Sequence, residues 1–380
     1  MVLVAAGLIG GVLALTTLNT DESAGVPDPN ASGVSGETLS TESATSGTTE
    51  SATSGTTEPV ESIPVAVEGP LLGVNLTAYT RDGYGKPSVR KAIETLATLG
   101  STAITLVPTW YMQSSTANTI APDQEKSPST ESLTKVIGWI RSAGMKVIMK
   151  PHVDVIDDSY RGEIQPADRD KWFRSYESFI DHFASFSTSH LVDLFVAGTE
   201  LSSLSTETDR WKAVIQTVRD RFKGPVTYAA NWDEVDQVQF WDALDAIGVD
   251  AYYPLTQQGS DTAPTLKELV EAWGGIAEQL RSKSESWGRP ILLTEVGYPS
   301  QKGATTTPYE VTGQPADQDI QALAYKATFR ALSGSDWLKG ISWWSWRADP
   351  GPDEKPEIDY TPENKKAQSE LAAGQSSFQE

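Results

Sequence analysis

Short apolar runs alternate with longer stretches in which apolar side chains recur every three or four positions, from about residue 71 to residue 373. The runs are rich in β-branched and aromatic residues, and the longer stretches have the period of amphipathic helices. The stretch at 129–143 is typical, because Ser129 can cap a helix there and Gly144 can end it. Its apolar face is formed by Leu133, Val136, Ile137 and Ile140. The pattern predicts strands at 71–76, 103–108, 146–151, 192–198, 225–230, 246–252, 290–296 and 338–346, and helices near 88–99, 129–143, 168–186, 207–222, 236–244, 265–286, 317–332 and 363–373.

Eight strand and helix units in about 300 residues match a (β/α)8 barrel better than an open, doubly wound sheet. The first predicted strand is followed by TAYTRDGYGKP, which lacks the glycine-rich fingerprint of a dinucleotide fold. We therefore predict an α/β protein with a TIM barrel over residues 70–375. In such a barrel the chemistry lies at the C-terminal ends of the strands.

The chain before this region is of a different kind. Residues 1–18 form an uncharged apolar run of about the length that crosses a membrane, which indicates a signal peptide or a membrane anchor. Residues 19–69 are rich in Ser, Thr and Glu and contain the octapeptide TESATSGT twice, at 41–48 and 49–56. Such a tract buries too little apolar surface to fold, so we expect a disordered linker. We therefore expect the protein to be secreted or tethered to the cell surface, with 1–18 as the candidate membrane tether. We also expect a monomer.

Composition narrows the chemistry. The net charge of −21 disfavours a nucleic-acid partner, because phosphate binding needs clustered Lys and Arg. The absence of cysteine excludes thiolate metal sites and cysteine nucleophiles, and three histidines are too few for most imidazole-based metal centres. We expect a neutral ligand or substrate and neither a metal nor a cofactor.

Two glutamates stand directly after apolar strands, Glu200 after LFVAGT and Glu295 after ILLT. Alternation puts Leu194, Val196, Gly198 and Glu200 on one side of the fourth strand, and Ile291, Leu293 and Glu295 on one side of the seventh. Both carboxyl groups can then point over the barrel mouth. Since burying an unpaired carboxylate is costly, two of them at opposite walls indicate an acid/base pair.

Polar and aromatic residues end the other strands: Asn75, Trp110, His152 and Asp154, Asn231 and Trp232, Tyr252, and Trp344 and Trp346. Aromatic rings stack on the C–H faces of sugars, so this set is typical of a carbohydrate cleft. Tyr252 could donate a hydrogen bond to Glu295, although plain core packing would also explain it. The polar loop 301–317 follows the seventh strand and is expected to border the cleft.

The region from about 71 to 373 resembles a clan A glycoside hydrolase, and more narrowly glycoside hydrolase family 113, known for β-mannanase activity. The motifs that carry the resemblance are VPTWYMQ (107–113), KVIMKPHVD (146–154), FVAGTELSS (195–203), GVDAYYPL (248–255), LLTEVGYPS (292–300) and SWWSW (342–346).

The resemblance implies that Glu200 is the general acid/base and Glu295 the nucleophile of a retaining hydrolysis, with β-1,4-mannan as the first candidate substrate. Retention requires carboxyl groups about 5 to 5.5 Å apart. The resemblance also implies that His152 and Asp154 bind the sugar or orient the glutamates, and that Trp346 is the platform beneath the sugar at the cleaved bond. Trp110 and Trp232 would flank it, and the remaining residues assigned to substrate binding are Asn75, Asn231 and Tyr252.

One position departs from clan A. Many of its members have Asn directly before the acid/base, whereas this chain has Thr199, so Asn231 is an alternative source of that contact. Two other functions stay open: a carbohydrate-binding surface protein on an inactive barrel, and a metal-dependent barrel hydrolase, which would need histidine and carboxylate ligands around one ion.

Overall fold

The computed structural model describes residues 68–259, 263–347, 349 and 355–379. The segment expected at 1–18 and the linker up to residue 67 lie outside the described residues. Within those ranges no helix combines the length and the apolar character that a membrane crossing requires.

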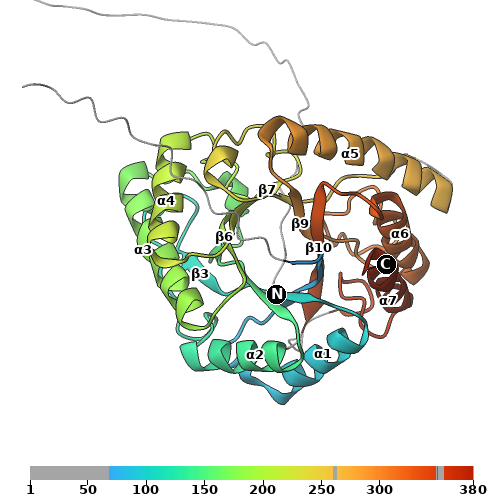
Figure 1. Ribbon diagram of the computed structural model, residues 1–380, viewed down its shortest axis with the longest axis horizontal. Coiled ribbons are helices and arrows are strands. Elements are labelled where there is room, and N and C mark those ends of the chain that lie inside the picture. The colour runs from blue at the N-terminus through green and yellow to red at the C-terminus, as the bar shows by residue number, and fades with distance from the viewer. Residues whose placement is uncertain (1–67, 260–262, 348, 350–354, 380) are drawn as a thin grey trace, which may run out of the picture. The chain divides into compact units, whose positions relative to one another are not determined.

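A closed barrel of parallel strands forms the centre of the part of the chain that the structure describes (Figure 1). Neighbouring strands run around it in the order β1-β2-β4-β6-β7-β8-β9-β10, and β10 pairs with β1 to close the ring. This is the predicted (β/α)8 fold. The barrel strands are β1 (Leu71–Thr77), β2 (Ala103–Leu106), β4 (Lys146–Met149), β6 (Leu194–Thr199), β7 (Val226–Asn231), β8 (Ile247–Asp250), β9 (Ile291–Val296) and β10 (Leu338–Arg347).

Helices surround the barrel and follow the predicted segments closely (Figure 1). The predicted cap at Ser129 is confirmed, because its side chain accepts a hydrogen bond from the backbone N–H of Ser132. Gly144 has a φ of +79°, as expected of a residue that ends a helix. The helices are α1 (Pro87–Thr98), α2 (Thr130–Ser142), α3 (Arg169–Ser189), α4 (Thr208–Arg221), α5 (Leu266–Trp287), α6 (Gln318–Leu332) and α7 (Lys366–Gln379).

The helix predicted near 236–244 was wrong. The segment holds only the single 3-10 turn η3 (Trp241–Ala243). Its apolar residues Val238, Phe240 and Trp241 are all buried, but they do not repeat over enough turns to define a helical face. Phe240 and Trp241 pack against Tyr228 of β7, in the cluster outside the barrel wall, as part of a compact connection from β7 to β8.

Two layers of apolar side chains pack against the two faces of the barrel wall. Small and branched residues from different strands, among them Ala103, Val196 and Leu292, form one cluster inside the barrel. A larger cluster joins the outer face of the strands to the helices. The barrel interior is therefore filled, and polar side chains gather where the strands end.

Two of the predicted strands continue past a break. After β2 and β4 the chain forms β3 (Thr109–Met112) and β5 (His152–Val155), which pair in parallel as a separate small sheet. This sheet extends the barrel wall and carries His152 and Asp154.

Candidate active site

Glu200 lies immediately after β6, with its backbone held by a hydrogen bond from its N–H to the carbonyl of Ala229 on β7. Its φ of +52° is uncommon for a residue with a side chain, and it turns the carboxyl out of the strand. Arg161 donates a hydrogen bond from Nη1 to Glu200 Oε2 at 2.9 Å. Glu200 is only 7% exposed, so this ion pair is largely shielded from water.

Glu295 lies on β9 and is 3% exposed. Lys150, at the end of β4, donates from Nζ to Glu295 Oε1 at 2.5 Å. Tyr252, after β8, donates its phenol hydrogen to the other oxygen, Oε2, at 2.5 Å. Both carboxylate oxygens are thus fixed by short hydrogen bonds from different strands.

Asp250 completes a buried carboxylate–ammonium–carboxylate arrangement around Lys150. Lys150 Nζ lies 2.9 Å from Asp250 Oδ1, and Thr294 Oγ1 donates to the same oxygen at 2.7 Å. Burial raises the pKa of Asp250 well above its ordinary value, and the charge of Glu295 adds to this. The lysine is completely buried and therefore needs both carboxyl groups as partners.

Glu200 and Glu295 belong to one electrostatic site. Burial raises the pKa of Glu200 to about 7, while Arg161 lowers this pKa and Glu295 raises it. The site holds the cations Lys150 and Arg161 and the carboxyl groups Asp154, Glu200, Asp250 and Glu295. Because the carboxyl groups outnumber the cations, the site favours protonated acids, and its pKa of about 7 lets Glu200 hold a proton near neutral pH.

His152 lies beside the nucleophile candidate but does not pair with it. Its Nε2 is 3.8 Å from Glu295 Oε1 and has no hydrogen-bond partner among the described residues. Burial, with the positive charges of Arg161 and Lys150, lowers the pKa of His152 well below its ordinary value. The lowered pKa favours the neutral imidazole, and Nε2 is a buried ring nitrogen that the described residues leave without a partner.

The amide nitrogens of Asn75 and Asn231 are engaged by the protein itself, whereas Asn75 Oδ1 has no hydrogen-bond partner among the described residues. Asn75 is fully buried and donates from Nδ2 to the carbonyl of Thr294 at 3.0 Å. Asn231 donates from Nδ2 to the hydroxyl of Tyr160 at 3.1 Å, and its Oδ1 accepts from the backbone of Trp232. The buried hydroxyl of Thr199 has no partner among the described residues, so it is the freer polar group next to Glu200.

The family model for glycoside hydrolase family 113 matches residues 76–365, which is most of the chain and the whole of this network. The chain belongs to glycoside hydrolase family 113. It is therefore a glycosidase with a clan A barrel, as the motifs indicated. A search of curated proteins found no significant match.

Solved structures agree with the family. The GH113 β-mannanase AaManA from Alicyclobacillus acidocaldarius, in complex with ManMIm, has a TM-score of 0.73 and is 26% identical, with 82% of this chain and 98% of that chain covered. A second GH113 β-1,4-mannanase has a TM-score of 0.71 at 22% identity, with 81% and 98% covered. A β-glucuronidase from Ruminococcus gnavus shares only the fold, with a TM-score of 0.56, 13% identity and coverage of 81% of this chain and 50% of that one.

Trp344 and Trp346 of β10 have different surroundings in this family 113 enzyme, whereas strict alternation would put both on the same side of the strand. Trp346 is completely buried and belongs to the cluster between strands and helices, so it offers no face to a sugar. Trp344 instead packs with Tyr252 and Tyr360 and stacks on His152, with ring centroids 6.0 Å apart. A register shift between β1 and β10 separates the two residues: Val74 pairs with Trp343 but Leu76 with Trp346, which puts one extra residue on β10.

Trp110 is also placed away from the network. Its ring packs against Phe179, His182 and Phe183 of α3, with centroids 5.2 to 5.7 Å apart. It joins β3 to the helical layer. Trp232 does face other partly exposed aromatic residues, because its ring is nearly parallel to that of Tyr309 in the loop 301–317, at 6.5 Å between centroids and 11° between planes.

Register shifts also account for the orientation of the two glutamates. Leu194 and Val196 face the barrel interior as predicted, but a Cβ added at Gly198 would meet Trp211 and Tyr228 on the outer side. On β9 the interior residue is Leu292, whereas Ile291 and Leu293 pack outward. Bulges before Thr199 and before Glu295 break the alternation.

Three residues of the network were not assigned from the sequence. Arg161 comes from the turn η2 (Arg161–Glu163) after β5 and has no periodic signal. Lys150 and Asp250 did carry a signal in the sequence. Each is a charged residue in or next to an apolar strand, in KVIMKP and in AIGVDAY. A buried charge in such a run needs an opposite charge, which could have paired them.

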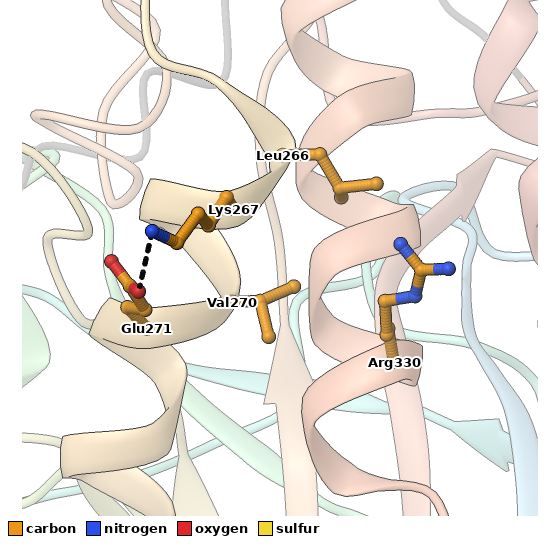
Figure 2. Close-up of a pocket in the computed structure, with 5 residues that line it drawn as sticks. All are labelled: Leu266, Lys267, Val270, Glu271 and Arg330. Carbon is orange, nitrogen blue, oxygen red and sulfur yellow. Dashed lines mark ion pairs between the residues drawn. The ribbon is translucent and has the colours of Figure 1, made fainter.

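A separate depression lies on the helical layer between α5 and α6 (Figure 2). Leu266 and Val270 face Arg330 across it, and Lys267 and Glu271 form an ion pair at 3.5 Å on its rim. None of the network residues lines it. Within the ranges that the structure describes, no three His, Asp or Glu side chains are grouped so as to hold a metal ion.

Proposed function

We propose that this glycosidase hydrolyses β-1,4-mannan with retention of configuration, using Glu200 as general acid/base and Glu295 as nucleophile. The observation that supports this assignment is the different treatment of the two carboxyl groups within one network. Burial raises the pKa of Glu200 to about 7, which suits a proton donor. Lys150 and Tyr252 hold both oxygens of Glu295, which orients a carboxylate for attack.

In the first step, Glu295 attacks the anomeric carbon while Glu200 transfers its proton to the leaving oxygen. A covalent glycosyl-enzyme forms, and the sugar leaving group departs as an alcohol. In the second step, Glu200 takes a proton from water, the water oxygen attacks the anomeric carbon, and the bond to Glu295 breaks. The excess of carboxyl groups over cations in the site stabilises the positive charge that develops on the sugar ring.

A neutral sugar fits the site better than an anionic one, because the carboxyl groups repel negative charge. The unpaired Nε2 of His152 and the stacked indole of Trp344 offer a polar and an apolar contact side by side. The β-mannanase names of the similar family 113 structures favour mannose units.

The decisive experiment compares the wild type with Glu295→Ala and Glu200→Gln on mannan, with proton NMR of the first products. We expect each variant to lose more than about 1,000-fold in kcat, and the wild type to release the β-anomer first. Glu285→Gln, on the exposed face of α5, is the matched control and should keep full activity. Release of the α-anomer first, or a fully active Glu295→Ala, would contradict the mechanism.

We also propose that residues 1–18 are a signal peptide or a membrane anchor and that 19–69 are a disordered linker to a monomeric barrel, since the two segments have the composition for these roles. A reporter fused after residue 69 should be exported, and the same fusion lacking 1–18 should stay inside the cell. Sedimentation of the barrel as a dimer would contradict the monomer.

A further inference from the structure

Arg161 connects two acidic residues of the site. It donates from Nη1 to Glu200 Oε2 at 2.9 Å and from Nη2 to Asp154 Oδ1 at 2.5 Å. Its Nε donates to the carbonyl of Val153 at 3.2 Å, so three donors of one planar group are fixed at once. The side chain is 16% exposed, and that of Glu200 is 9% exposed.

We propose that Arg161 is a positioning residue for Glu200: it fixes the acid/base carboxyl and, with its charge shared with Asp154, sets the pH above which Glu200 no longer donates a proton. This inference rests on the proposed acid/base role of Glu200. Arg161 itself would not touch the reacting atoms, so its effect reaches the substrate only through Glu200.

Each of the two glutamates is bound by a cation that an aspartate shares, but Glu295 has one more hydrogen-bond donor than Glu200. Glu295 is held by Lys150, which it shares with Asp250, and by a second donor, Tyr252. Glu200 is held by Arg161, shared with Asp154, and no second side-chain donor to Glu200 occurs among the described residues. A single cation therefore fixes the orientation of the acid/base, whereas the nucleophile has two donors.

The ionisation of Glu200 depends on groups from several elements. Arg161 of η2 and Lys150 after β4 favour the charged form, while Glu295 of β9 and the buried Glu234 after β7 disfavour it. Burial and the nearby charge of Glu200 raise the pKa of Tyr160, and Asp154 of β5 affects Glu200 through its hydrogen bond with Arg161. Of the two cations, only Arg161 makes a hydrogen bond to Glu200, so its removal should have the larger effect.

The test compares pH profiles of kcat/KM on mannan for the wild type, Arg161→Met, Arg161→Lys and Asp154→Asn. Activity should fall as pH rises through the pKa of Glu200, because the acid must carry its proton. Arg161→Met should move this descending limb upward by about one pH unit or more. Arg161→Lys should restore most of the wild-type position, and Asp154→Asn should move the limb downward because the guanidinium charge then acts on Glu200 alone.

Arg169→Met is the matched control, since Arg169 pairs with Glu207 on the surface. It should leave the profile unchanged. An Arg161→Met limb that stays in place or moves downward would overturn the proposal, as would shifts of Arg161→Met and Asp154→Asn in the same direction.

A direct titration separates this inference from the proposed function. In protein labelled with 13C at the glutamate carboxyl carbon, the Glu200 signal is assigned by its loss in Glu200→Gln. Its titration midpoint should rise in Arg161→Met whether or not mannan is the substrate. A raised midpoint in a protein that hydrolyses no mannan would leave the Arg161 inference intact and reject the substrate, whereas an unchanged midpoint would reject the inference alone.

Discussion

The indole of Trp344 lies parallel to the imidazole of His152, with the ring centroids 6.0 Å apart and the planes at 7°. Trp344 comes from β10 and His152 from β5, so the contact joins the barrel to the small accessory sheet. On the His152 side, Nε2 lies 3.8 Å from Glu295 Oε1 and has no hydrogen-bond partner among the described residues. Under the proposed mechanism, we expect the sugar at the cleaved bond to lie beside this pair.

Replacing Trp344 should affect turnover, and replacing Trp346 should affect stability. Trp344→Ala is expected to lower kcat/KM on mannooligosaccharides by about tenfold or more through loss of a stacking face. Trp346→Phe removes part of a fully buried ring and should lower the free energy of unfolding by about 1 to 3 kcal/mol with little change in kcat/KM. Kinetics and urea unfolding of both variants measure this. If Trp346→Phe lowers kcat/KM and Trp344→Ala lowers only the stability, Trp346 is the residue that stacks on the sugar.

Tyr252→Phe removes one of the two donors to Glu295 while keeping the ring. A hydrogen bond to a charged group contributes about 1.5 to 3 kcal/mol, so kcat should fall by about 10- to 100-fold. The effect should also appear in kcat/KM for an aryl mannoside, which reports the glycosylation step. Full activity of Tyr252→Phe on that substrate would show that Lys150 alone orients the nucleophile.

Lys150→Met leaves the buried carboxyl groups of Asp250 and Glu295 facing each other without a cation. Breaking such a buried ion pair costs about 3 to 5 kcal/mol, and we expect the free energy of unfolding at pH 7 to fall by that amount. Lys86→Met is the control. Lys86 pairs with Asp349 and is 46% exposed, so its loss should cost less than about 1 kcal/mol. Equal losses in the two variants would contradict the burial argument.

The buried Glu234, which lies outside the proposed catalytic pair, should make the stability of the protein depend on pH. Burial raises its pKa to about 7, although Tyr228 and the backbone of Asn231 donate hydrogen bonds to it. The folded state therefore keeps a proton that the unfolded chain loses near pH 4.5, and the resulting stabilisation, present below pH 4.5, is lost as pH rises to 7. Glu234→Gln should remove about 3 kcal/mol of this pH dependence in unfolding experiments. If the stability of Glu234→Gln depends on pH as steeply as that of the wild type, the raised pKa of Glu234 is rejected.

The parallel rings of Trp232 and Tyr309 should form a binding wall. Trp232→Ala and Tyr309→Ala are expected to raise KM for mannan about tenfold with a small change in kcat, because stacking on units away from the cleaved bond binds ground state and transition state alike. An aryl mannoside with a single sugar should be unaffected and serves as the internal control. An equal rise in KM for both substrates would place the pair at the cleaved sugar instead.

The barrel could be predicted from the sequence because the alternation of strand and helix patterns extends through the whole domain and sums over many residues. Glu200 and Glu295 could be predicted because a charged residue directly after an apolar strand needs a physical reason. The detailed alternation was wrong at Gly198, Ile291 and Leu293, since bulges change which side faces the interior. Both glutamates nevertheless lie in the network at the strand ends, because the bulges fall just before them; their catalytic roles stay a prediction.

Arg161 and the different packing of Trp344 and Trp346 could not be predicted in this way. Arg161 follows a loop whose path depends on tertiary contacts, and no periodic pattern reports where a loop residue points. The extra residue on β10 is fixed by its pairing with β1, more than 260 positions earlier in the chain. Local sequence carries no record of that pairing.

The loop 301–317 is fastened at several points. Gln301 pairs with Ala316 across its base, Tyr360 donates to the carbonyl of Pro308 at 2.8 Å, and the backbone of Leu255 binds that of Thr305. Tyr309 is thus held in place by the protein before any polymer arrives. The conformational entropy of this wall is lost once, when the chain folds, and not again at each encounter. A substrate that stacks on Tyr309, as predicted above, would therefore bind without a closing movement of this loop.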